Sequence, residues 1–188
     1  MRLKQARITP VEPADWNEAQ RAELSGHVER GTLLNVTKTL ARNPDALKGF
    51  LAWARYVNYG SALASREREI VILRIGVLCR SGYEWVQHVG MGKAAGLTAE
   101  EIERIKRGTA AEGWSDADRA LLNAADELHH DHFISDATWA ALKRHFNDFE
   151  CMDVVFAAGL YTQISMALNT FGVQLEDGQV LDPDLAAY

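Results

Sequence analysis

Cysteine is scarce in this sequence: its 188 residues include only Cys79 and Cys151, which are far apart and form no C-x-x-C pair. This excludes a disulfide scaffold and a four-thiolate metal site, and it is typical of a protein from a reducing cytoplasm. Proline is also rare, with 4 residues, and the chain contains no internal repeat, low-complexity tract or flexible linker. We therefore expect a single cytoplasmic domain.

An excess of positive charge is absent as well. The chain has 20 basic and 26 acidic residues, which gives a formal net charge of -6. Such a balance does not favour nucleic acid or anionic lipid as a partner. The most apolar long segment, residues 151–171, is interrupted by Asp153, Gln163 and Asn169, and the N-terminus has no apolar stretch of signal-peptide length. We therefore expect neither a membrane span nor a secretion signal.

The residues that are present indicate helices. Apolar residues make up 47% of the chain and charged residues 24%, as in an ordinary globular domain. From Leu33 onward, apolar positions recur at helical spacing. Capping boxes begin at Ser81 and Thr98, and Gly108 and Gly172 are placed to end helices. These signals predict an all-α, single-domain bundle of seven or eight helices.

Three parts follow from this pattern: an irregular N-terminal arm over residues 1–25, a helical domain over residues 26–175 and a polar tail over residues 176–188. Ser65 is the expected N-cap of one helix. The run IVILRIGVLC, residues 70–79, is ambiguous because its β-branched residues are also typical of a buried parallel strand. No other segment resembles a partner strand, so we predict a buried helix.

Ser81, Glu84 and His88 form the most suggestive chemical pattern. Their spacings of three and four place them on one face of a helix. His88 is suited to proton transfer near neutral pH, and Glu84 is placed to hold its ring. The structural alternative is that Ser81 and Glu84 cap a helix and that Glu84 and His88 form an ordinary i,i+4 surface pair.

Two other features concern charge and metal binding. Arg74 lies within an apolar stretch, where it needs a buried carboxylate or a ligand anion as its partner. The tract His129-His130-Asp131-His132, with Asp126 one turn earlier, resembles a metal-binding cluster. It lies at an expected helix end, where solvated histidines compensate the helix dipole, and the sequence identifies no further ligand. We therefore expect no metal site.

Residues 66–105, REREIVILRIGVLCRSGYEWVQHVGMGKAAGLTAEEIERI, resemble the core of the carboxymuconolactone decarboxylase family. That superfamily also contains the alkyl hydroperoxidase D (AhpD) proteins. The resemblance extends from about Gly31 to Gly172. It implies an all-α AhpD-like fold, assembled as a homotrimer or homohexamer, and it favours a helix at residues 70–79.

The resemblance also suggests roles for single residues. The peroxidase branch has a glutamate, a C-x-x-C pair and a histidine, and these positions correspond here to Glu69, to Ser81 and Glu84, and to His88. The redox pair is missing, and a serine hydroxyl cannot form a disulfide, so a thiol peroxidase mechanism is not expected. The decarboxylase branch lacks the cysteine pair and has a glutamate four residues before the histidine, which Glu84 and His88 match.

The leading hypothesis is a cofactor-free, lyase-type enzyme that performs acid–base chemistry on a small carboxylated or lactone-like substrate. His88 donates or relays a proton, Glu84 orients its ring and Glu69 completes the relay. Ser81 and Arg74 are the expected substrate-binding residues, with neutralisation of Glu69 as the alternative role of Arg74. Two alternatives remain: a peroxide-related antioxidant protein with the single thiol Cys79, and a non-catalytic helical oligomer that binds a small acid.

Overall fold

The computed structural model describes residues 2–185, and within them every regular element is a helix. The all-α prediction is therefore confirmed. In chain order the α-helices are α1 (Glu18–Glu29), α2 (Asn35–Leu40), α3 (Pro44–Arg55), α4 (Ser65–Leu78), α5 (Gly82–Ala94), α6 (Ala99–Arg107), α7 (Asp116–His130), α8 (Asp136–Lys143) and α9 (Asp148–Phe171). One turn of π-helix, Tyr56–Gly60, follows α3.

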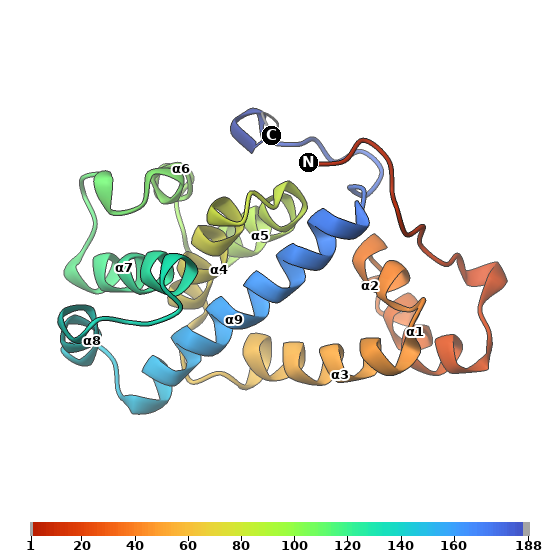
Figure 1. Ribbon diagram of the computed structural model, residues 1–188, viewed down its shortest axis with the longest axis horizontal. Coiled ribbons are helices and arrows are strands. Elements are labelled where there is room, and N and C mark those ends of the chain that lie inside the picture. Colours follow the sequence, from red (N-terminus) through yellow and green to blue (C-terminus); the bar gives the residue numbers. More distant parts are fainter. Residues whose placement is uncertain (1, 186–188) are drawn as a thin grey trace.

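Helix α4 lies at the centre of the bundle, where it packs against α5, α7 and α9 (Figure 1). All its residues from Arg68 to Gly76 are buried. A helix enclosed on every side needs apolar residues all round, without the one-sided stripe of a surface helix. This explains why the run at residues 70–79 resembles a buried strand in sequence, and the prediction of a buried helix is confirmed.

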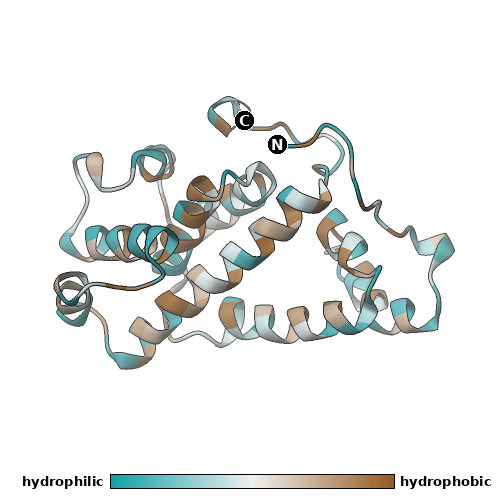
Figure 2. Ribbon diagram, viewed as in Figure 1, coloured by the Kyte–Doolittle hydropathy of each residue, from teal (hydrophilic) through white to brown (hydrophobic). Residues whose placement is uncertain are grey.

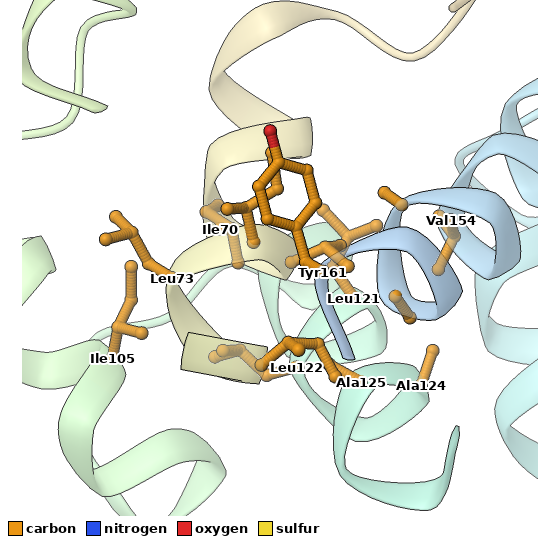
Figure 3. Close-up of a cluster of buried hydrophobic side chains, with 14 of the residues drawn as sticks. Ile70, Leu73, Ile105, Leu121, Leu122, Ala124, Ala125, Val154 and Tyr161 are labelled. Carbon is orange, nitrogen blue, oxygen red and sulfur yellow. The ribbon is translucent and has the colours of Figure 1, made fainter. Parts of the chain in front are cut away.

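The main core fills the space between α4, α6, α7 and α9. Figure 3 shows Ile70 and Leu73 of α4 beside Leu121 and Leu122 of α7, with Tyr161 of α9 standing among them. Fully burying one such leucine or isoleucine side chain contributes about 1.5–3 kcal/mol to the free energy of unfolding. The core therefore fixes α4 relative to α7 and α9.

Helix α9 crosses the whole molecule and carries long apolar stretches (Figures 1 and 2). By length and composition alone its 24 residues could cross a membrane. Ten of its positions, including Asp153, Tyr161 and Ser165, are instead buried inside the bundle. The core of the fold therefore accounts for its apolar character.

Several helix boundaries agree with the sequence signals. Thr98 and Glu101 form the predicted capping box of α6, and α9 ends at Gly172 in the left-handed conformation. Two predicted caps are wrong. Ser81 is the N-cap of α5 but its side chain makes no cap hydrogen bond, and Ala64, not Ser65, is the N-cap of α4.

The N-terminal arm differs from its expected form. Helix α1 begins at Glu18, within residues 1–25, and a capping box between Asn17 and Gln20 starts it. This helix brings the number of α-helices in the described residues to nine. Trp16, just before α1, is buried and donates its indole N–H to the carbonyl of Val11 at 3.1 Å. The arm is thus packed onto the bundle.

From residue 176 to residue 185 the chain is irregular apart from one 3-10 turn, Pro183–Leu185. It is nevertheless held against α5. Tyr83 donates its hydroxyl to Glu176 at 2.7 Å, and Trp85 donates its indole N–H to Asp182 at 3.0 Å. The carbonyl of Leu3 accepts from the side chain of Gln174 at 3.4 Å, so the start of the described chain lies beside the segment that follows α9.

Candidate active site

The structure brings Glu69, Glu84 and His88 together. The Nδ1 atom of His88 lies 2.8 Å from Oε2 of Glu69, and its Nε2 atom lies 3.0 Å from Oε1 of Glu84. Each of the three residues exposes 6% or less of its surface. The imidazole is thus held between two carboxylates inside the protein, and we call these three residues the carboxylate–histidine triad.

A glycine of α5 lets that helix lie close to α4 at the triad. A Cβ atom on Gly92 would lie 3.2 Å from Leu73 and 3.9 Å from the Cβ of Glu69. A side chain at this position would therefore press on Leu73, next to the helix position of the triad glutamate. At Gly76 of α4 a Cβ atom would lie 3.9 Å from the Cβ of Glu84, which is an ordinary contact distance.

The environment of His88 favours its protonated form. Burial alone would lower the pKa of the ring, because the low-dielectric interior disfavours charge. The hydrogen bonds and negative charges of Glu69 and Glu84 outweigh burial and raise the pKa of His88 to about 9. At neutral pH the ring is therefore an imidazolium, and each ring nitrogen donates its proton to one carboxylate.

Ser81 lies at the start of α5, one turn before Glu84. Its hydroxyl is fully buried and has no hydrogen-bond partner among the described residues. Because this hydroxyl does not cap α5, the first N–H groups of the helix lack the usual side-chain acceptor. Buried polar groups normally have a partner, so this end of α5 has capacity to bind one.

Tyr161 of α9 completes the wall around His88 and was not predicted. Its ring stands edge-on to the imidazole, with 4.8 Å between the ring centroids. Its hydroxyl points away from the apolar cluster in Figure 3 and donates to Oδ1 of Asn58 at 2.8 Å. Asn58 belongs to the π-helical turn after α3, and such turns occur often at functional sites. Nothing in the spacing of Tyr161 along an apolar helix could have indicated this contact.

Arg74 does not join the triad. Its guanidinium donates to both carboxylate oxygens of Asp126 on α7, at 2.5 and 3.1 Å, and to the carbonyls of Ile105 and Lys106. Arg74 therefore has a carboxylate partner, but it is the partly exposed Asp126 and not the buried Glu69. The expectation that Arg74 binds substrate beside His88 is not supported by this geometry.

Cys79 lies at the end of α4, half-buried, with its Sγ atom 3.7 Å from Nδ1 of His129. Burial raises the pKa of the Cys79 thiol, and the hydroxyls of Thr162 and Ser165 offset this only in part. Burial lowers the pKa of His129. The pair therefore favours a neutral thiol beside a neutral imidazole, which is not an activated nucleophile.

The histidine tract ends α7 as expected. His130 and His132 each direct Nδ1 at a backbone carbonyl of that helix, those of Asp126 and Leu128. Within residues 2–185, no group of three or more His, Cys, Asp and Glu side chains is arranged to hold a metal ion. In this structure His130 and His132 of the tract therefore provide hydrogen-bond partners for backbone carbonyls at the end of α7.

Comparison with known proteins relates the central part of the chain to one family. The model of the Carboxymuconolactone decarboxylase family matches residues 44–127, a segment that contains all three residues of the triad. No curated protein sequence matches this chain. The family match supports the resemblance to the carboxymuconolactone decarboxylase and AhpD-like superfamily that residues 66–105 predict.

Solved structures show the same fold over nearly the whole chain. An uncharacterized peroxidase-related protein from Ralstonia eutropha, described as an AhpD core, has 22% sequence identity and a TM-score of 0.79, over 94% of this chain and 98% of its own. A peroxidase-related protein from Silicibacter sp. has 20% identity and a TM-score of 0.77, with the same coverage. The debrominase Bmp8, in complex with 2,3,4-tribromopyrrole, has 12% identity and a TM-score of 0.76, over 93% and 94%. At these identities the likeness concerns the fold alone.

Proposed function

We propose that this protein is an enzyme that transfers a proton to a small carboxylated or lactone-like substrate, without a cofactor. The observation that supports the proposal is the buried imidazolium of His88 between Glu69 and Glu84. A histidine with a pKa of about 9 carries its proton throughout the neutral range, so it is loaded before the substrate arrives. Burying two carboxylates around one histidine costs desolvation free energy, and apolar side chains of similar size would fill the same space without that cost. Packing alone therefore does not explain the triad.

The reaction that fits this arrangement is decarboxylation followed by protonation. Loss of carbon dioxide from a lactone acid leaves an electron pair that is delocalised toward the ring carbonyl. A proton from His88, given directly or through Glu84, then forms the new C–H or O–H bond, and His88 regains a proton from water. Glu69 keeps Nδ1 protonated, so that transfer takes place at the Nε2 side of the ring.

The start of α5 is the proposed binding point for the acidic end of the substrate. The hydroxyl of Ser81 is buried without a partner, and the first N–H groups of α5 lack a side-chain acceptor. A carboxylate or carbonyl oxygen satisfies both, and the helix dipole adds to the attraction. Ser81 and Glu84 lie on the same face, so a substrate bound there is presented to the proton-transfer pair.

The test is carbon dioxide release from a panel of unsaturated lactone acids and keto acids. We expect His88→Gln to lower turnover on the accepted substrate by about 10²–10⁴-fold, the usual contribution of a positioned acid or base. His145→Gln is the matched control, because His145 is exposed and lies on a different part of the bundle. Full activity of His88→Gln, beside an active wild type, would refute the proposal.

The single-thiol alternative is not favoured by the environment of Cys79. Its pKa is raised, and the other cysteine, Cys151, is fully buried in α9. A peroxidatic cysteine needs a thiolate and a route to its regeneration. Peroxide consumption that disappears in Cys79→Ser would favour this alternative instead.

We also propose that the protein assembles as a homotrimer or homohexamer through an aromatic surface. Trp53 and Tyr56 stack at 5.4 Å between centroids and both pack edge-on against Phe156 of α9, although each is about 40% exposed. Met152, one turn from Phe156, is 48% exposed. Contiguous exposed apolar groups of this kind favour a protein partner. Light scattering of the wild type and of Trp53→Lys tests this, and a monomeric wild type would exclude it.

A further inference from the structure

A cavity of about 740 Å³ lies at the C-terminal end of α4, between that helix, α7 and α9. Its size is within the range of small-molecule sites, which is roughly 300–1,000 Å³. Cys79 and Thr162 form part of its wall, whereas Glu69, Glu84 and His88 are not among its lining residues. The proposed chemistry at His88 therefore leaves this cavity unexplained.

The charged residues that line the cavity are all basic. Arg2, Arg74, Arg80 and Lys106 contribute to it from four different segments, together with three histidines of the α7 terminus. No aspartate or glutamate is among its lining residues. In a chain whose formal net charge is -6, such a concentration of cations in one hollow does not follow from composition.

Acidic residues lie nearby and bind at least two of these cations. Asp126 accepts from Arg74, and Glu103, Asp182 and Asp184 lie 2.9, 2.7 and 2.9 Å from the ammonium group of Lys106. These carboxylates hold the two side chains in place without lining the cavity. Arg74 and Lys106 are therefore the members of these pairs that line it.

The rest of the lining is partly apolar. Val77 and Leu78 at the end of α4 and Met166 of α9 contribute to the wall. Met166 is 62% exposed, so it stands where the cavity meets solvent. Apolar walls with a few fixed charges are the usual composition of a site for a small amphipathic molecule.

We propose that this cavity is a second binding site, which takes a small organic carboxylate with an apolar body. The carboxylate group lies toward the basic side chains, and the apolar body packs against the end of α4 and Met166. The proposal does not depend on catalysis at His88, since it concerns binding to residues outside the triad.

Cys79 provides a direct probe, because its thiol lines the cavity while Cys151 is fully buried. Iodoacetate and iodoacetamide alkylate the same thiolate, but only iodoacetate is an anion. The ratio of their rates at Cys79, measured by peptide mass spectrometry, is therefore independent of the thiol's pKa. We expect this ratio to exceed that of N-acetylcysteine amide in the same buffer, and to fall as salt is added.

Charge variants sharpen this measurement. Arg2→Gln is expected to lower the ratio roughly two- to sixfold, the effect of one unit charge at about 8 Å in water-rich surroundings. Arg55→Gln removes an exposed arginine of α3 that does not line the cavity, and it should leave the ratio unchanged. A native ratio at or below that of the free thiol would overturn the proposal, as would equal effects of the two variants.

Ligand protection tests the size and polarity of the site. Benzoate should slow alkylation of Cys79 by iodoacetamide, whereas uncharged benzamide of the same shape should not. Met166→Trp, which fills the mouth from an exposed position, should abolish this protection. Equal protection by benzoate and benzamide would contradict the proposal. None of these readouts requires turnover, so an inactive His88→Gln protein serves equally well and the two proposals fail separately.

Discussion

Removing one carboxylate from the triad should lower the pKa of His88 toward its ordinary value. In Glu84→Gln the side chain keeps its size and its ability to accept a hydrogen bond, but it loses its charge. The pKa of His88 in the wild type is about 9, against the ordinary value of 6.5. Burial lowers it, so the two carboxylates together raise it by more than the difference of about 2.5.

It follows that at least one carboxylate contributes more than half of that difference. Of the two variants Glu84→Gln and Glu69→Gln, at least one must therefore lower the pKa of His88 by about one unit or more. If the two carboxylates contribute equally, both variants must do so. Each carboxylate then favours the imidazolium by roughly 2 kcal/mol.

The assay is an NMR titration of the histidine ring signals between pH 5 and 10, with His88 assigned by its absence in His88→Gln. Glu100→Gln serves as a control, since Glu100 is an exposed residue of α6. A His88 pKa that stays near 9 in both triad variants would refute the reasoning, because it would mean that the carboxylates do not hold the proton. A wild-type pKa near 6.5 would refute it at once.

Three further predictions concern stability. The pKa of His88 is raised on folding, so its protonation should contribute about 3 kcal/mol to the free energy of unfolding below pH 6.5, and this contribution should be lost as the pH rises to about 9. Urea denaturation at both ends of this pH window measures it. Stability that increases with pH in the window would contradict the assignment. Gly108 has a φ of +58°, and a Cβ atom there would lie 2.6 Å from the guanidinium of Arg74, so Gly108→Ala should lower the free energy of unfolding by about 2 kcal/mol or more in the same assay. Gly49→Ala is the control, because a Cβ atom at this helix position has nothing within 4 Å, and it should raise the free energy of unfolding by about 0.5–1 kcal/mol. The side chain of Asn147 caps α9 by accepting from the N–H of Glu150, so Asn147→Ala should cost about 0.5–2 kcal/mol, and an unchanged melting temperature would show that the cap contributes nothing.

Much of the fold could be predicted from local signals. Thr98 is a predicted helix cap whose function depends on the nearest three or four residues, and it accepts the expected backbone N–H from Glu101. Ser115 and Ser135 begin α7 and α8 in the same way. Helix α1 was missed because its capping box is N-x-x-Q, between Asn17 and Gln20, and it follows two prolines. Its short apolar face is defined only by contacts with distant helices.

The site was predictable to the extent that it lies on one helix. Glu84 and His88 are four residues apart on α5, so helical geometry alone brings them together. The pairing of Glu69 with His88 came from the family resemblance and needed the packing of α4 on α5. Tyr161 lies 73 positions after His88, which it contacts, and Asp126 lies 52 positions after its partner Arg74. No local sequence pattern encodes contacts over such separations.

The residue at position 84 bears directly on the chemistry that the proposed function assigns to the triad. In the resembling peroxidase branch that position holds the second cysteine of the redox pair, and a histidine beside a thiol can accept its proton. Glu84 instead presents a carboxylate to Nε2 at 3.0 Å, while Glu69 occupies Nδ1 at 2.8 Å. With an acceptor on both sides the ring is stabilised as a cation, so it is a poor base toward Cys79 or any other thiol. A cation that holds its proton at neutral pH can still donate it to a stronger base that forms only during a reaction, such as a carbanion left by decarboxylation. Under the proposed function, a carboxylate at this position would replace thiol oxidation by proton donation.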